Sequence, residues 1–192
     1  MPIWLINLLI GVVLSVVSTL AQQAFAPKQQ GRGIRGTIQS GGKVPLSFLI
    51  GTIGVPGKLE YRNTWGTAGG TQNAYLVDVI SFGDLPISDF TGLWVNGQEV
   101  TVEGSGHVTQ GYPVTEYDNG TDHLWAEFYD GTQTTVSAYL AAKFGADADR
   151  PWTSDMIGRG VPMLTLTALL EDTLWSGFPT YMAQFEGVPL FD

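Results

Sequence analysis

The hydrophobic pattern divides the chain into a continuous apolar segment and a longer body in which apolar and polar positions alternate. The nineteen residues Ile3 to Ala21 carry no charged side chain. As a helix they would extend about 28 Å, which is enough to cross the core of a bilayer. We therefore predict an apolar N-terminal helix over residues 1–26. Candidate packing positions along it are Trp4, Leu5, Leu8, Leu9, Val12, Val13 and Val16.

Three interpretations of this segment compete. A secretory signal would need a basic n-region, which is missing here, and Pro27 would follow directly after the cleavage pattern Ala24-Phe25-Ala26. A membrane anchor fits the length, and the basic residues that follow would hold the body in the cytoplasm. A helix buried against sibling subunits, or inside a tube, fits the all-round hydrophobicity equally well. The first interpretation is disfavoured, and the sequence does not separate the other two.

The next segment, residues 27–42, is polar, rich in glycine and basic. Its cationic side chains are Lys28, Arg32 and Arg35, and no acidic residue occurs before Glu60. Clustered glycines without hydrophobic periodicity are typical of a loop, so we interpret the segment as a linker or an extended arm. Its basic residues are candidates for contacts in an assembly.

The body, residues 43–192, has the pattern of short β-strands joined by tight turns. Asn96-Gly97 between alternating runs is a strong hairpin signal, because both turn positions need a positive φ. The run Leu124–Phe128 alternates and predicts a strand with one face exposed to water. Predicted strands lie within Val44–Tyr61, Leu93–Val102, Leu124–Phe128, Val161–Leu170 and Tyr181–Phe191, the last folded about Glu186-Gly187.

One short helix is expected in this body, over Val136–Phe144. Thr134 or Thr135 would cap its N-terminus, and Gly145 would end it. The predicted fold class is therefore mainly β, with short strands and hairpins in barrel-like or sandwich-like domains, one short helix, and the apolar helix in front. Residues 73–155 are a candidate inserted lobe, which would make the body two interleaved lobes.

The amino-acid composition restricts the possible chemistry of the protein more than it restricts the possible folds. The 192 residues include no cysteine, which excludes disulfides, zinc–cysteine sites and thiol catalysis. Nine Lys and Arg oppose eighteen Asp and Glu, giving a net charge of −9. The signs are segregated: the chain carries +5 through Arg62 and −14 after it. An acidic body is unsuited to general nucleic-acid binding, which depends on neutralising phosphates.

No motif predicts a catalytic, cofactor-binding or metal-ligating residue. Gly31–Gly36 has the spacing of a dinucleotide fingerprint, but neither a strand before it nor a helix after it is predicted. The only histidines, His107 and His123, lack metal-ligand spacing and are predicted to lie on the surface or in turns. The clustered aspartates fit turn chemistry. Paired carboxylates for glycoside hydrolysis stay open, because such pairing is spatial rather than sequential.

Several stretches in order resemble one known family. Val44–Tyr61 resembles the opening of phage tail-tip hub proteins, in which a valine-proline pair leads into strands separated by glycines. Ala74–Leu85, ending near a Ser-x-Gly turn, and the Val-Asn-Gly hairpin of Gly92–Val100 resemble the next elements. Arg150–Trp152 and Trp175–Asp192 are similar to later parts of the same region. The family is that of the lambda-type tail-tip attachment protein and its relatives in gene transfer agents.

This resemblance implies a structural part of a virion rather than an enzyme, without cofactors. Such hubs are homotrimers that close or line the distal end of the tail tube, contact distal tail and tape-measure proteins, and let DNA pass through the lumen without specific binding. The implied location is the tail tip, with transient contact of Met1–Ala26 with the host envelope. Family members are far longer, so the chain is expected to correspond to an N-terminal hub segment.

Two other classes of protein stay as alternatives. A bacterial membrane-anchored β-domain would explain the apolar segment and the basic linker. A cell-wall hydrolase would need two nearby carboxylates in a concave site. For the hub, the acidic body suggests a use: an acidic inner face would repel a passing DNA backbone and keep it from sticking.

Overall fold

The computed structural model describes residues 38–40 and 48–187. The chain divides into two units, Met1–Arg32 and Gly33–Asp192, and every described residue belongs to the second. The predicted apolar helix and the arm lie outside the described residues, and so do all ten candidate contact residues from Trp4 to Arg35. Among the residues that are described, no helix is both long and apolar enough to span a membrane.

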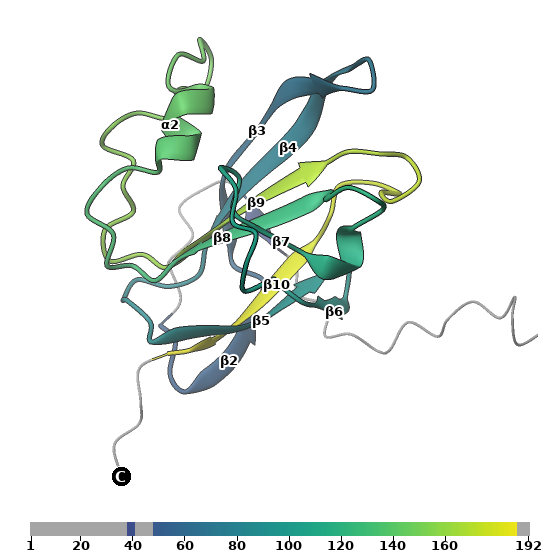
Figure 1. Ribbon diagram of the computed structural model, residues 1–192. Coiled ribbons are helices and arrows are strands. Elements are labelled where there is room, and N and C mark those ends of the chain that lie inside the picture. Colours follow the sequence, from purple (N-terminus) through teal and green to yellow (C-terminus); the bar gives the residue numbers. More distant parts are fainter. Residues whose placement is uncertain (1–37, 41–47, 188–192) are drawn as a thin grey trace, which may run out of the picture. The chain divides into compact units, whose positions relative to one another are not determined.

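The described part is built from two β-sheets and one short α-helix, which confirms the mainly β class (Figure 1). One sheet has six strands in the order β1-β3-β4-β9-β8-β7, and the other has four in the order β2-β10-β5-β6. The elements are β1 (Gln39–Ser40), β2 (Thr52–Val55), β3 (Lys58–Ala68), β4 (Thr71–Ser81), β5 (Asp89–Val95), β6 (Gln98–Val100), β7 (Tyr112–Pro113), the 3₁₀ turn η1 (Thr115–Tyr117), β8 (Leu124–Tyr129), α2 (Ala138–Phe144), β9 (Met163–Leu169) and β10 (Tyr181–Glu186).

The main hydrophobic core takes side chains from both sheets. Ile80 of β4, Leu166 of β9 and Phe185 of β10 are fully buried in it. The core draws on strands separated by about a hundred residues, so it forms only when the whole body folds. Strands β3 and β4 make the longest hairpin, eleven residues each, joined at Gly69-Gly70, both with positive φ.

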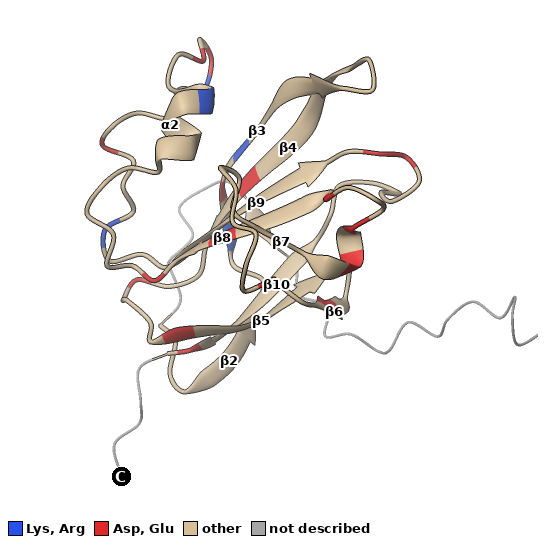
Figure 2. Cartoon of the chain, in the orientation of Figure 1, with Lys and Arg blue, Asp and Glu red and all other residues tan. Residues whose placement is uncertain are grey.

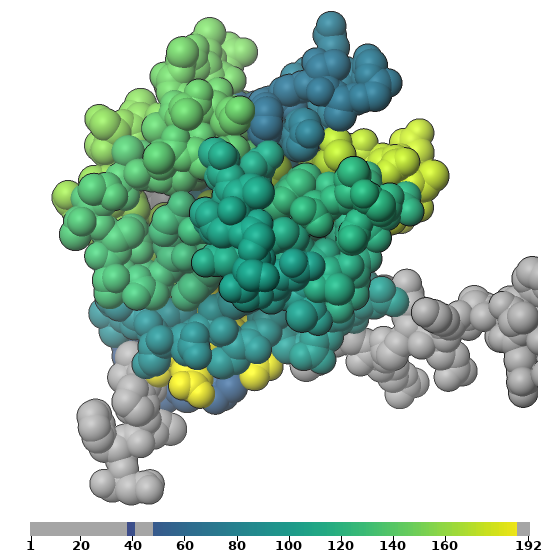
Figure 3. Space-filling model, in the orientation of Figure 1, coloured from purple at the N-terminus to yellow at the C-terminus, as the bar shows by residue number. Residues whose placement is uncertain are grey.

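A second hydrophobic cluster lies where α2 packs against the six-stranded sheet. Leu140 and Phe144 of α2 pack with Val77 and Val79 of β4 and with Trp152. The ammonium group of Lys143 lies 3.8 Å from the ring centroid of Trp65 near the end of the β3–β4 hairpin. Figure 3 shows the α2 region in green beside this hairpin in blue. Strand β4 is consequently buried on both faces, as its nearly continuous burial indicates.

The predicted Asn-Gly hairpin is confirmed. Asn96 and Gly97 have φ values of 53° and 79° and join β5 to β6. The predicted helix is shorter at its start: Ser137, rather than Thr134 or Thr135, caps it by accepting a hydrogen bond from the Leu140 N–H. Gly145 is the C-cap, as predicted. The later strands also occur, although residues 188–191 of the last prediction lie outside the described part.

The predicted wet face of the strand at Leu124–Phe128 is wrong. Trp125 points to the face expected to be exposed, yet it is buried. Its ring centroid lies 6.3 Å from that of Tyr75 on β4, within the same sheet. Alternation in the sequence identified the strand correctly. It did not predict that Tyr75 of a neighbouring strand would bury the outward-facing Trp125.

Candidate functional site

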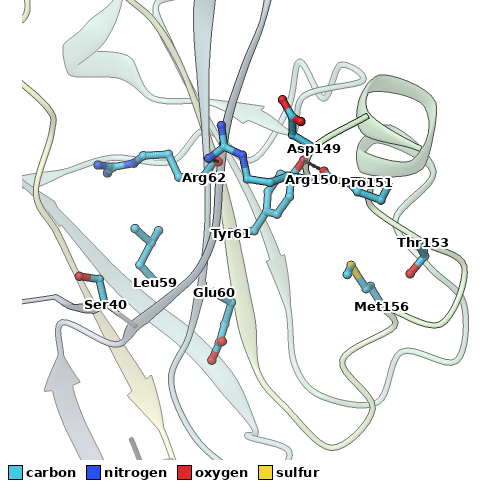
Figure 4. A pocket seen from close by; sticks show the side chains of 10 residues that line it. All are labelled: Ser40, Leu59, Glu60, Tyr61, Arg62, Asp149, Arg150, Pro151, Thr153 and Met156. Atoms are coloured by element: carbon cyan, nitrogen blue, oxygen red, sulfur yellow. Dashed lines mark hydrogen bonds between the residues drawn. The ribbon is translucent and has the colours of Figure 1, made fainter. Parts of the chain in front are cut away.

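A cavity of about 550 Å³ lies beside β3 and the loop that follows α2 (Figure 4). Its lining combines two arginines, two acidic side chains and an aromatic ring. The lining residues are Ser40, Leu59, Glu60, Tyr61, Arg62, Asp149, Arg150, Pro151, Thr153 and Met156. No sequence pattern predicted these as a site, because they come from segments about ninety residues apart.

Arg62 is neutralised inside the protein by a two-point ion pair. Its Nε and Nη2 donate to the carboxylate oxygens of Asp78 at 2.6 and 2.7 Å. The Asp78 side chain is only 1% exposed. Burial raises the pKa of Asp78, and the bonds from Arg62 offset part of that rise. In turn, the hydrogen bond to Asp78 raises the pKa of Arg62. The pair therefore stabilises the wall of the cavity rather than presenting a free charge.

The opposite wall is held by a hydrogen-bond chain to the post-helix loop. The Tyr61 hydroxyl donates to the Arg150 carbonyl at 2.8 Å, and Asn63 Nδ2 donates to both Tyr61 and Asp147 at 2.9 Å. Backbone N–H groups, with that of Arg150 first, lower the pKa of Asp147. Figure 4 shows the Arg150 side chain reaching to β3, where its Nη1 donates to the Arg62 carbonyl at 2.8 Å.

Glu60, Arg62 and Arg150 of this cavity each bond to a partner within the protein, which limits the chemistry they support. Glu60 accepts from the Ser81 hydroxyl at 2.6 Å and from Lys58 at 3.1 Å. Asp78 has a raised pKa, the property that a general acid requires, but both its oxygens are bound by Arg62. The arrangement serves to fix the post-helix loop onto β3.

The same contacts protect an edge of the six-stranded sheet. Beyond its short pairing with β1, β3 has no neighbouring strand on its outer side among the described residues. Arg150 occupies the Arg62 carbonyl, and the Asn63 side chain accepts from the Thr64 N–H. Side chains that occupy edge groups in this way hinder pairing with another chain. This edge is therefore guarded against strand addition.

Strand β2, at the edge of the four-stranded sheet, has no such protection from the residues that the structure describes. Its four residues carry no charge, and its exposed neighbours are apolar. Phe48 is 54% exposed, Ile50 44% and Ile53 38%. An uncharged apolar edge strand is prone to pair with a partner strand. It is a candidate assembly surface, and the long uncharged run after Lys43 is the signal in the sequence that could have located it.

The two histidines differ from each other. His107 is exposed, as predicted, and its Nε2 lies 2.7 Å from a Glu127 oxygen. His123 was predicted to lie on the surface or in a turn, but it is buried, with only 5% of the residue exposed. Its Nδ1 lies 2.6 Å from the Thr121 carbonyl and its Nε2 2.8 Å from Glu171, so it links two loops. Across the described ranges, no group of three or more His, Asp or Glu side chains could hold a metal ion.

The described residues thus form two sheets, with side chains bonded along the β3 edge and exposed apolar residues along the β2 edge. Comparison with known proteins agrees on the architecture. A solved chain from the virion of a native gene transfer agent (GTA) particle has a similar fold, with a TM-score of 0.51 and 15% sequence identity. The match covers 91% of this chain and 38% of that one. No family model matches the sequence, and no curated protein matches it.

Proposed function

We propose that the protein is a structural component of a phage or phage-like virion, and specifically the N-terminal part of a tail-tip hub. The observation that carries the proposal is the fold shared with a chain of a gene transfer agent virion over 91% of this chain. The hub-like sequence motifs are a separate line of support, because the likeness in fold was found by comparing structures and not by comparing the motif residues. The finer position at the tail tip rests on those motifs.

The motifs fall on connected parts of the fold. The glycine-punctuated stretch up to Tyr61 supplies β2 and the start of β3, and Ala74–Leu85 supplies most of β4. The Val-Asn-Gly hairpin forms β5 and β6, and Trp175–Gly187 contains β10, which lies between β2 and β5. These four segments thus contribute to paired strands, whereas Arg150–Trp152 lies in the loop after α2. The placement of the four segments supports a resemblance that extends over much of the region rather than over scattered turns.

The proposed role is not enzymatic. The Asp78 carboxyl, whose pKa is raised, is held by Arg62, and Glu60 of the cavity beside β3 accepts from the Ser81 hydroxyl. In this role the protein needs no cofactor. It assembles as a homotrimer, contacts distal tail and tape-measure proteins, and lets DNA pass through the lumen during delivery. Residues 1–26 would then serve as a lumen plug or as a host-membrane contact.

Two measurements test this proposal. Light scattering of the purified full chain is expected to give three times the chain mass. Gold-labelled antibodies against the body are expected to mark the distal tip of purified virions from the same source, with antibodies against the capsid as the matched control. Label confined to the capsid would refute the tail-tip position. A monomer recovered only in membranes would instead support the membrane-anchored β-domain.

A further inference from the structure

A second cavity, also about 550 Å³ and called the slot below, is lined by residues of both sheets. Sites of about 300–1,000 Å³ accommodate ligands or short peptide segments. Residues from β5, β6, β7, β8 and β9 contribute to it. They are Asp89, Phe90, Thr91, Gly92, Leu93, Glu99, Val100, Thr101, Val102, Tyr112, Ala126, Glu127, Phe128 and Leu164.

The slot has strand edges along both sides. Strand β6 pairs only with Leu93–Val95 of β5, which leaves Asp89–Gly92 without a neighbouring strand on that side among the described residues. Strand β7 likewise pairs only with Trp125-Ala126 of β8, and Gly111 lies against the peptide that joins Ala126 to Glu127. Phe128-Tyr129 has no neighbouring strand on that side among the described residues. The edges converge at one end, where the Ile87 N–H donates to the Asp130 carbonyl at 3.0 Å. The Phe90 N–H donates to the Asp89 side chain at 2.8 Å, and the other stretches without a neighbouring strand suit a short extended segment.

The interior of the slot is aromatic and aliphatic. Phe90 and Phe128 stack with ring centroids 5.2 Å apart, and both pack on the buried Phe185. Neither Phe90 nor Phe128 is fully buried, so part of the main core is accessible from the slot. An occupant would gain apolar burial here, worth about 25 cal/mol for each Å² removed from water.

The lining is acidic as well as apolar. It includes Asp89, Glu99 and Glu127 but no lysine or arginine. The complementary charge lies elsewhere in the sequence: the first 59 residues contain five basic side chains and no acidic one. Within them, Gly33–Thr37 has the sequence Gly-Ile-Arg-Gly-Thr, one apolar and one cationic side chain between small neighbours. Glycine permits close approach of backbones.

We propose that this slot receives the segment Gly33–Thr37 of a second copy of the chain. Ile34 enters the aromatic interior, Arg35 faces the acidic lining, and the segment adds a short strand between β5 and β8. The inference rests on the proposed function, because it requires that copies of the chain assemble. It adds one contact that joins two copies.

Chain length favours a second copy as the source of the segment. Ile38 immediately precedes β1, at the edge of the six-stranded sheet, and β8 lies four strand positions away. At about 4.8 Å per strand this is about 19 Å. The four residues from Ile34 to Ile38 span at most about 14 Å when fully extended. Across a flat sheet, a segment from the same chain would fall short of β8, which favours a second copy as its source.

Because the chain has no cysteine, cross-linking gives a direct test. Full-length Ile34→Cys and Thr91→Cys chains are co-expressed and mildly oxidised. Thr91 lines the slot and is exposed. We expect a disulfide-linked dimer at least about tenfold more abundant than with Thr67→Cys in place of Thr91→Cys; tenfold corresponds to about 1.4 kcal/mol. Thr67 is also exposed, on β3 near the tip of its hairpin.

A charge reversal adds a second readout. Asp89→Lys should reduce the cross-link yield at least about tenfold, because like charges across a contact cost several kcal/mol. Asp172→Lys is the matched control, since it makes the same change at an exposed residue that does not line the slot. Equal loss in both variants would contradict the proposal.

The remaining outcomes are distinguishable. Oligomers that form without a disulfide between the Ile34→Cys and Thr91→Cys chains would overturn this inference and leave the proposed function standing. A purely intramolecular link in the double variant Ile34→Cys/Thr91→Cys would overturn the second copy as source. A chain that stays monomeric under all conditions would overturn the inference and the proposed hub together.

Discussion

At the scale of single residues, the buried pair Arg62–Asp78 has the clearest energetic consequence. Replacing Arg62 with Met leaves a carboxylate that is 1% exposed without its two donors. Removing one partner of a buried pair typically costs about 3–5 kcal/mol. We expect Arg62→Met to lower the free energy of unfolding by about 3 kcal/mol at neutral pH. Urea denaturation measures this, and the double variant Arg62→Met/Asp78→Leu should recover much of the loss.

The same variant should show a defined pH dependence. Burial raises the pKa of Asp78 and Arg62 lowers it, so removing Arg62 raises the pKa further. A carboxyl with a raised pKa in the folded state stabilises the fold below its unfolded pKa, and that stability is lost as pH rises through the folded pKa. The deficit of Arg62→Met relative to the native chain should therefore shrink between about pH 7 and about pH 4. A deficit that grows on acidification would contradict this assignment.

His123 shows what residue-level reasoning from sequence misses. Spacing along the chain gave no information about its burial or its contacts. One of its two partners, Glu171, lies 48 positions away in the sequence. Its burial depends on loops that meet only in the folded chain. Neither fact is encoded in neighbouring residues. The contacts of Tyr61 with Arg150 and of Asn63 with Asp147 are non-local for the same reason.

At the scale of elements, the start of α2 gives a sharp comparison. Ser137 Oγ accepts the Leu140 N–H, and losing an N-cap side chain costs about 1 kcal/mol. Ser137→Ala should lower the free energy of unfolding by about that amount. Thr134→Ala and Thr135→Ala, at exposed positions that lie before the cap, should change it by less than about 0.5 kcal/mol. Chemical denaturation of the three variants decides which residue caps the helix.

The turn between β2 and β3 depends on Gly57. Its φ is +70°, and an added Cβ would lie 2.5 Å from the Ile80 side chain and 2.7 Å from the Ser81 carbonyl. The strained backbone and the overlap with a buried strand each cost about 1–3 kcal/mol. We expect Gly57→Ala to destabilise the fold by about 3 kcal/mol.

Gly177→Ala is the control for that substitution. No atom lies within 4 Å of a Cβ at Gly177, so its melting temperature should stay within a few degrees of the native value. Similar melting temperatures for both variants would show that the β2–β3 turn can relax.

Local signals explain which elements could be predicted. The β5–β6 hairpin was found because Asn96-Gly97 dictates its turn through its own backbone conformation. The end of α2 was found because Gly145 is a local stop signal. The pairing of β10 between β2 and β5, and the cover of Trp125 by β4, follow from tertiary packing and have no local signature. The helix start was missed because three closely spaced hydroxyl-bearing candidates surround it, and only packing selects Ser137.

At the scale of the whole molecule, charge is the property that relates the fold to the proposed role in DNA delivery. The described residues carry 17 acidic and 5 basic side chains, a net charge of −12. Figure 2 shows the acidic residues spread over several loops and strands rather than gathered in one patch. A surface of this sign repels phosphates wherever DNA approaches it. The basic arm, with Arg32 and Arg35, is the segment that could oppose this effect.

We therefore expect the full chain to bind double-stranded DNA weakly at about 50 mM salt, and any binding to come from the arm. Arg32→Ala/Arg35→Ala should abolish the residual binding, whereas Arg150→Ala/Arg159→Ala, which removes equal charge from the body, should leave it unchanged. Fluorescence anisotropy with a labelled duplex across a salt series measures both. DNA binding that persists in the Arg32→Ala/Arg35→Ala variant would mean that the acidic body holds DNA. A protein that holds DNA in this way is a poor channel wall, and the proposed role in the tail lumen would fail.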